Sequence, residues 1–291
     1  MRVEEVVDRV WPGAHPEVEP LGGGITNHNF KVTLDGDAFV LRIGGKDTEL
    51  LGIERRVEEA ASRTAAELGI GPQVVRFLEP EGYLVTRFVE GRPIPPEEMR
   101  VPARLRQAAG TLARFHGARP IPGRFDSFRV VEAYRETAAR HGVSIPAAYD
   151  WAKEQADRIE RERAAAQVVP CHNDLLNANF ILEGDRLWLV DWEYAGMGDR
   201  FFDLANFSVN HELGEDENQA LLEAYFGAVR AEDARALRLM RFMSDFREAM
   251  WGVVQQGISE LDFDFRAYAG EHFERLRRTA AEPAFHAALA G

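Results

Sequence analysis

The chain has 291 residues, 45% of them hydrophobic and 29% charged, with a formal net charge of -13 at pH 7. These proportions are ordinary for a folded protein, and no apolar run is long enough to cross a bilayer, so we expect no membrane insertion. The acidic balance argues against nucleic acid as a partner, because phosphates repel a negative protein. The charged N-terminus lacks the apolar core of a secretion signal and Cys171 is the single cysteine, so we expect a cytoplasmic protein.

The first third of the chain has the pattern of a small sheet that carries one helix. In NHNFKVTLDGDAFVLRI, two alternating segments flank Asp35-Gly36, a hairpin signal because glycine accepts the positive φ of the turn. The stretch GIERRVEEAASRTAAELGIGP predicts a helix that stops at the glycines before Pro72. Two more strands are expected in QVVRFLEPEGYLVTRFVEG, around Glu81-Gly82.

The rest of the chain has a mostly helical pattern after the connector EGRPIPPEE. One apolar face in VPARLRQAAGTLARFHG predicts a helix buried on that side, and DARALRLMRFMSDFREAMWGVVQQGIS and RAYAGEHFERLRRTA predict two more. The segments VVPCH and FILEGDRLWLVDW predict short strands. We therefore expect an α+β fold with an N-terminal sheet lobe over residues 1–90 and a helical C-terminal lobe over residues 91–291.

The segment HNDLLNANF carries the chemistry of the C-terminal half. His172, Asp174 and Asn179 have the order H-x-D-x-x-x-x-N, and Asp191 follows a strand pattern. Phosphoryl transfer in protein-kinase-like folds needs a carboxylate that takes the hydroxyl proton, and an Asn and an Asp that hold Mg2+ on the phosphates of ATP. The alternative is that HND caps a turn and Asp191 only ends a strand.

Two features upstream bear on phosphate binding. The loop in GGGITNHNF can offer backbone N–H groups to phosphates, although glycine triplets are more often plain turns. Arg42 at the end of a strand and Glu58 on the following helix are candidates for the ion pair that holds the nucleotide phosphates in kinase-like sites. Glu59 is a rival for Glu58, and surface pairs without function are common.

With these motifs, the chain resembles the choline/ethanolamine kinase family, within the larger aminoglycoside phosphotransferase group of small-molecule kinases. The resemblance implies a protein-kinase-like two-lobed fold, ATP and Mg2+ as cofactors, and choline or a related amino-alcohol as acceptor. The tryptophan-bearing WGVVQQGIS together with DFDFRAYA favours choline kinases of the bacterial type. The similar segments are GGGITNHNFKV, FVLRI, IERRVEEA, LVTRFVEG, HNDLLNANFIL, LVDWEYAGMGDRFFDLANF and REAMWGVVQQGISELDFDFRAYAGEHF.

The resemblance also implies site residues. It makes Asp174 the catalytic base, with Asn179 and Asp191 on Mg2+, and it places Arg42, paired with Glu58, on the phosphates of ATP. The other implied nucleotide contacts are Asn27 in the phosphate loop and the hinge residues Thr86, Arg87, Phe88 and Val89. The implied acceptor contacts are Tyr194, Asn206, Trp251, Phe263 and Tyr268.

One position departs from the family pattern. Eukaryotic members have a second tryptophan one turn before the matched one, where this chain has Glu248. The predicted cage is thus less aromatic, so either Glu248 contributes directly to cation binding or the substrate differs. Trp251, Tyr194 and Tyr268 have the alternative of being core residues.

Other polar residues are expected to be structural. His116, His211 and Cys171 have no spacing that indicates a metal or a nucleophile. Asp203 is expected to order the loop after Asp191, because an aspartate near a helix start satisfies free N–H groups.

Two alternatives to a choline kinase remain open at this stage. The acceptor can be another small hydroxyl compound such as an aminoglycoside or thiamine, because the group shares its ATP site. A binding protein without catalysis is disfavoured by the presence of Asp174, Asn179 and Asp191. The sequence leaves the oligomeric state open.

Overall fold

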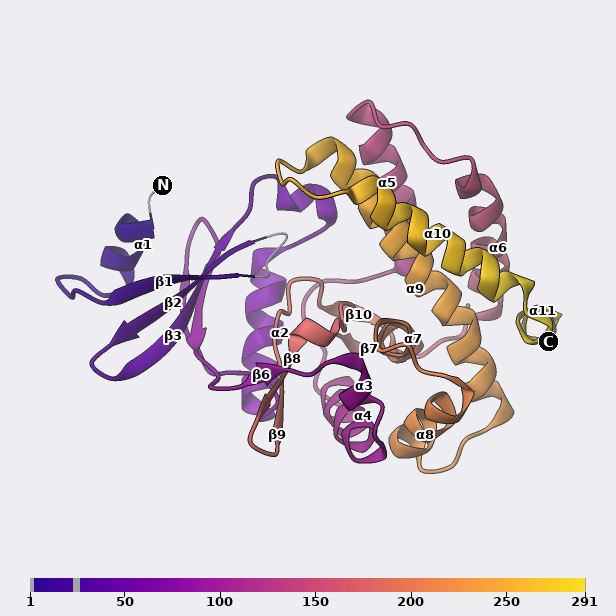
Figure 1. The fold of residues 1–291 in the computed structure, drawn as a ribbon, viewed down its shortest axis with the longest axis horizontal. Helices are drawn as coiled ribbons and strands as arrows, with labels where there is room; N and C mark the ends of the chain where they lie inside the picture. Colours follow the sequence, from indigo (N-terminus) through magenta and orange to yellow (C-terminus); the bar gives the residue numbers. More distant parts are fainter. Residues whose placement is uncertain (1–2, 23–26, 291) are drawn as a thin grey trace.

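In the computed structural model, which describes residues 3–22 and 27–290, a sheet-bearing N-terminal part adjoins a helical C-terminal part (Figure 1). The N-terminal sheet has five antiparallel strands in the order β1-β2-β3-β5-β4. Asp35 and Gly36, both at positive φ, form the predicted turn between β2 and β3. The elements of this part are α1 (Val3–Val10), β1 (Glu17–Leu21), β2 (Asn27–Leu34), β3 (Asp37–Gly44), η1 (Thr48–Leu51), α2 (Arg55–Glu67), β4 (Val74–Leu78) and β5 (Tyr83–Arg87).

Two helices pack in this part, where one was expected. Helix α1 and strand β1 were not predicted, and the valines of α1 share a small core with Val32, Leu41 and Val85 of the sheet. Helix α2 instead contributes Ala61 and Ala65 to the large core of the C-terminal part. The helix therefore joins the sheet to the helical part, as Figure 1 shows.

The C-terminal part is built around α9, a helix of 28 residues that contacts α5, α7 and α10. The predicted apolar face of α4 is buried in the same core. None of the helices in the described ranges has the length and hydropathy that a membrane span requires. The helices are α3 (Pro96–Met99), α4 (Pro102–His116), α5 (Ser127–Arg140), α6 (Ala148–Glu162), α7 (Arg200–Asn210), α8 (Glu215–Phe226), α9 (Ala231–Ile258), α10 (Phe265–Ala281) and α11 (Pro283–Ala290).

Short strands at the junction of the two parts position the HND segment. Strand β7 pairs with β10, and β8 pairs with β6 and β9. Strand β6 pairs with β8 of the C-terminal part and not with the N-terminal sheet, so the chain passes from one part to the other between β5 and β6. We therefore propose the boundary between the lobes near residue 90. The short elements here are β6 (Arg92–Pro93), β7 (Val168–Cys171), η2 (Asn177–Asn179), β8 (Phe180–Glu183), β9 (Arg186–Leu189) and β10 (Gly196–Asp199).

Candidate active site

The loop after β7 is held by one buried carboxylate. Asp203, in the first turn of α7, accepts the backbone N–H of His172 at 2.8 Å and of Asn173 at 2.7 Å. His116 of α4 contacts the same carboxylate at 2.9 Å through Nε2. Asp203 therefore orders the loop before Asp174, and not the loop after Asp191 as expected from the sequence. The helix start itself is capped by Asp199.

The ring of His172 connects the backbone of this loop to the backbone at Val190. Its Nε2 lies 2.9 Å from the carbonyl of Val190, and the backbone N–H of Asp174 donates to its Nδ1 at 3.2 Å. Only the neutral ring with its proton on Nε2 satisfies both contacts, and burial lowers the pKa of His172 accordingly. Asn173 has a φ of +67° and donates from Nδ2 to the carbonyl of Tyr194 at 3.0 Å, which fixes the bend before Asp174.

Asp174, Asn179 and Asp191, predicted as one constellation, lie close together. Asn179 donates from Nδ2 to the carbonyl of Asp174 at 2.8 Å and to its Oδ2 at 3.4 Å. Its own carbonyl accepts the N–H of Val190, next to Asp191. Asp191 has a φ of +67°, a conformation rare outside glycine and frequent at functional sites.

Asp174 is buried, with its side chain 12% exposed. Burial raises its pKa to about 7; Glu248 and Asp191 add to this effect, and the guanidinium of Arg247 opposes it. A carboxyl with a pKa near neutrality is suited to general-base catalysis, because it is a stronger base than an ordinary aspartate and is still ionised in about half of the molecules at neutral pH.

Arg42 joins the N-terminal sheet to this constellation. Its Nη1 lies 2.7 Å from Oε1 of Glu58 and 2.6 Å from Oδ1 of Asp191. The rival Glu59 pairs with Arg63 instead. Burial alone would lower the pKa of Arg42, but the surrounding carboxylates, Asp191 first among them, raise it well above its usual range. The predicted ion pair with Glu58 is thus present, while its role toward phosphates stays a prediction.

A second polar cluster beside Arg42 contains Arg55 and Glu193, which the sequence reasoning did not name, together with the predicted Asn27. Asn27 donates from Nδ2 to Oε2 of Glu193 at 2.8 Å, and Arg55 donates to Oδ1 of Asn27 at 2.9 Å and to Oε2 of Glu58 at 2.8 Å. Burial, and next the charge of Asp191, raise the pKa of Glu193 to about 8. Asn27 begins β2, and residues 23–26 of the predicted phosphate loop lie outside the described residues.

The side chains of the predicted hinge residues lie in different surroundings. Thr86 lines a small cavity that Arg42, Glu58 and Asp191 also line. The side chain of Arg87 turns to the surface, where it pairs with Asp37. The N–H groups of Arg87 and Phe88 bond to the carbonyls of Gln73 and Ala38, and Phe88 packs under Lys31. The structure gives no contact of Val89 with the Thr86 cavity, so contact of this hinge with adenine stays a prediction.

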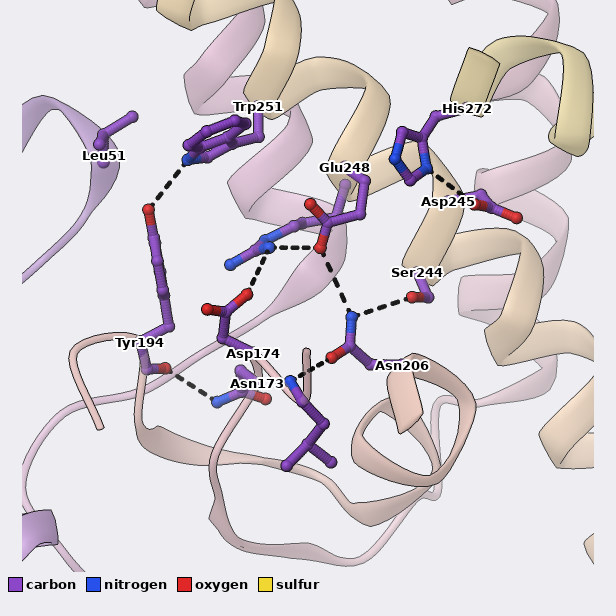
Figure 2. A network of polar contacts seen from close by, with 12 residues as sticks. Leu51, Asn173, Asp174, Tyr194, Asn206, Ser244, Asp245, Glu248, Trp251 and His272 are labelled. Carbon is purple, nitrogen blue, oxygen red and sulfur yellow. Dashed lines mark hydrogen bonds and ion pairs between the residues drawn. The ribbon is translucent and has the colours of Figure 1, made fainter. Parts of the chain in front are cut away.

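Most predicted acceptor residues gather at one place beside Asp174. In Figure 2, Tyr194 and Trp251 face each other, and Nε1 of Trp251 donates to the Tyr194 hydroxyl at 3.0 Å. The Tyr268 hydroxyl donates to Oε2 of Glu248 at 2.8 Å, and the Tyr268 and Trp251 rings meet edge-on with centroids 5.5 Å apart. Phe263, which is 45% exposed, stands next to Tyr268 at 6.1 Å.

Asn206 is the predicted acceptor residue that the structure places differently. It is fully buried, its Oδ1 accepts the N–H of Leu175 at 2.5 Å, and its Nδ2 donates to Oγ of Ser244 at 3.1 Å (Figure 2). Both ends of the amide are therefore used within the protein. Asn206 thus ties the HND loop to α9, and its predicted contact with the acceptor stays a prediction.

Arg247, which the sequence reasoning passed over, lies between the catalytic loop and the acceptor residues. Its Nη1 donates to Oε1 of Glu248 at 2.5 Å and to Oδ1 of Asp174 at 3.4 Å, and its guanidinium carbon lies 4.4 Å from the ring centroid of Tyr194. Burial alone would raise the pKa of Glu248, but the guanidinium holds it below its usual range. The charge of Glu248 is thus paired with Arg247, and its direct contribution to cation binding stays a prediction.

Comparisons with known proteins place this site in a family. A sequence model described as "Phosphotransferase enzyme family" matches residues 17–240. The crystal structure of a choline/ethanolamine kinase family protein from Mesorhizobium loti superposes with a TM-score of 0.84 at 31% identity, covering 100% of this chain and 98% of that chain. The chain belongs to the choline/ethanolamine kinase family of phosphotransferases.

Two LicA proteins are further relatives of this member of the choline/ethanolamine kinase family. A LicA protein of Haemophilus influenzae is 28% identical over 215 residues, which cover 70% of this chain and 61% of that protein. The crystal structure of choline kinase LicA from Streptococcus pneumoniae has a TM-score of 0.81 at 23% identity, covers 96% of this chain and 98% of that one, and shows the shared fold. The resemblance that the motifs indicated is confirmed, as is the two-lobed α+β fold.

The residues expected to be structural in this choline/ethanolamine kinase family member have structural contacts. His116, Cys171 and Asp203 bring their ligand atoms within 4.8 Å of one another. Both ring nitrogens of His116 are occupied, however, by Asp203 and by the hydroxyl of Tyr225 at 2.7 Å. Burial raises the pKa of the Cys171 thiol and lowers that of His211 to about 4, as is typical of inert buried groups.

Proposed function

We propose that this chain transfers the γ-phosphate of ATP to the hydroxyl of choline, or of a similar amino-alcohol. One observation carries the proposal: Asp174 and the acid of the acceptor pocket, Glu248, share the single guanidinium of Arg247. A general base and a pocket for a cation are therefore adjacent. The relatives from Mesorhizobium loti and Streptococcus pneumoniae, by their descriptions, belong with choline or ethanolamine kinases, which supports this acceptor class.

The acceptor pocket has the chemistry that an amino-alcohol requires. A quaternary ammonium has no N–H to donate, so it is held by aromatic faces and nearby negative charge. Tyr194, Trp251 and Tyr268 supply rings, and Glu248 supplies the carboxylate. Phe263, exposed at the side of Tyr268, is placed to cover a bound acceptor.

In the proposed reaction, Asp174 receives the proton of the acceptor hydroxyl while the hydroxyl oxygen forms a bond to the γ-phosphorus of ATP and the bond from that phosphorus to ADP breaks. Nδ2 of Asn179 donates to the carboxylate, and the backbone N–H of Asp174 donates to Nδ1 of His172, which fixes the backbone at this residue. At a pKa of about 7, Asp174 is ionised in a large share of molecules at neutral pH and binds the proton more firmly than an ordinary aspartate does. Asp203 keeps the loop in register without touching the reacting atoms.

The donors near Asp174 fit Mg2+, which prefers hard oxygen ligands. Asn179 uses its Nδ2 toward Asp174, which leaves its Oδ1 as the donor for a cation. Asp191 uses Oδ1 for Arg42 and offers Oδ2. We assign Asn179 and Asp191 to the metal, whose contribution when bound is to neutralise phosphate charge.

The N-terminal lobe is assigned to ATP. Arg42, held by Glu58, presents its remaining donors to phosphates, and Asn27 lies at the end of the glycine-rich loop. Thr86 borders the cavity that also reaches Arg42, which supports adenine binding along residues 86–89.

A coupled ADP-release assay across choline, ethanolamine, thiamine and several aminoglycosides tests the proposal. We expect acceptor-dependent ADP release with choline or ethanolamine, and loss of it by orders of magnitude in Asp174→Ala. Preferred turnover of an aminoglycoside or thiamine would replace the acceptor and keep the kinase assignment. No ADP release with any acceptor would favour the binding protein without catalysis.

A further inference from the structure

Arg247 is a cation buried inside the pocket proposed for a cationic acceptor. The residue is 1% exposed and lies on α9 between Phe246 and Glu248. Its guanidinium carbon, 4.4 Å from the ring centroid of Tyr194, is within the range of a cation–π contact. The same group touches the carboxylates of Asp174 and Glu248. An aromatic face with flanking carboxylates is also the environment that an ammonium would select.

The guanidinium is incompletely bonded in this place. Nη1 makes both ion pairs, while Nε and Nη2 are buried and have no hydrogen-bond partner among the described residues. Unsatisfied buried donors weaken the hold of the site on this group. Two like charges cannot share one ring face in a water-poor pocket, because their repulsion is strong there. An acceptor ammonium and the Arg247 guanidinium therefore compete for the Tyr194 face.

We propose that Arg247 is a specificity-determining residue whose guanidinium occupies the acceptor's cation position, and that an ammonium acceptor binds by displacing it from Tyr194. The inference rests on the proposed amino-alcohol acceptor. A long, flexible side chain can leave by rotating about its own torsions. Displacing Arg247 costs binding free energy, so a cation must bind strongly enough to offset that cost. Cations that cannot also present a hydroxyl to Asp174 lack one of the contacts that offset it, and Arg247 therefore discriminates against them.

The experiment measures binding of tetramethylammonium, a quaternary ammonium without a hydroxyl, to the full chain by isothermal titration calorimetry. Arg247→Met vacates the ring face but also makes the pocket more negative. The double variant Arg247→Met/Glu248→Gln vacates the same face at unchanged net charge, and it avoids leaving Glu248 buried without its partner. The matched control is Arg241→Met, because Arg241 lies on the same helix and contacts Ser208 and Leu213 instead of the pocket.

We expect tetramethylammonium to bind at least tenfold more tightly to Arg247→Met than to the unmodified chain, and at least tenfold more tightly to the double variant than to Glu248→Gln alone, with Arg241→Met unchanged. Binding that is unchanged or weaker in both comparisons would overturn the proposal. Tightening in the first comparison alone would also overturn it, because that pattern reports the unpaired charge of Glu248 and not a vacated position. If Arg247→Met does not fold, as judged by its thermal melt, the double variant decides the question.

Choline and ethanolamine turnover by the unmodified chain is measured beside the titration. Absence of that turnover, together with tighter tetramethylammonium binding in the variants, would remove the proposed acceptor while keeping the occupied cation position. Normal turnover without tighter tetramethylammonium binding in the variants would keep the proposed acceptor and remove the occupied cation position. The two conclusions therefore fail separately.

Discussion

Asp174→Asn separates the catalytic and the stability roles of the buried carboxyl. The pKa of Asp174 rises from an ordinary 3.8 to about 7 in the fold. The two pKa values differ by roughly 3, and a pKa difference of 1 corresponds to ~1.4 kcal/mol. The ionised carboxylate therefore destabilises the fold by up to ~4 kcal/mol. Because the folded pKa is raised, the favourable contribution is complete below pH 4 and is lost as pH rises to about 7. Asparagine has the same size and cannot ionise.

Urea unfolding of both proteins without ligands, from pH 5 to pH 9, measures this effect. We expect Asp174→Asn to gain stability relative to the original chain as pH rises, with the difference level above pH 8. Its kcat should fall by about 10²–10⁴ fold, the usual contribution of a general base. In the original chain, kcat/KM should rise with pH through an apparent pKa near 7. A stability difference that does not vary with pH would refute the reasoning from burial.

Three further substitutions test other parts of the site. Arg42→Lys should raise the KM for ATP, because a single nitrogen can keep both ion pairs but lacks the remaining donors assigned to the phosphates. Arg42→Met should lower turnover at least a hundredfold, and equal losses in the two variants would contradict this. Asp203→Ala should lower the free energy of unfolding by roughly 2–4 kcal/mol, since it leaves two buried N–H groups unpaired, and a thermal melt with turnover beside it checks both effects. Trp251→Leu should lower kcat/KM for choline by roughly tenfold and for ethanolamine by less, with Trp251→Phe as the ring-retaining control; an equal fall for both acceptors would return Trp251 to a core role.

The sequence predicted correctly those features that neighbouring residues determine. The turn at Asp35-Gly36 and the buried face of α4 depend on neighbouring residues only. Strand β1 was missed because Pro20 argues against a strand, yet β1 lies at the edge of the sheet, where proline is tolerated. Helix α1 spans only 8 residues, which is too short for its valine periodicity to stand out.

The same distinction holds in the site. Asp174 and Asn179 are five residues apart, so their spacing shows in the sequence. The contact of Arg55 with Glu193 joins residues 138 apart, and that of Arg247 with Asp174 joins residues 73 apart. No local pattern reports such pairs, although a basic residue inside a buried helical face, as in FREAMW, is a signal that it needs a partner.

The length of α9 bears on how such enzymes diversify over generations. The segment shared with phosphotransferases at large ends at residue 240, within this helix, and the pocket residues Arg247, Glu248 and Trp251 follow on its second half. A continuous helix keeps its residues at a fixed spacing of about 1.5 Å along the axis, so Arg247, Glu248 and Trp251 keep a fixed position relative to the part of α9 that the family model matches. With the proposed acceptor site, substitutions within little more than one turn of this helix change which alcohol is accepted and leave the residues assigned to phosphate in place.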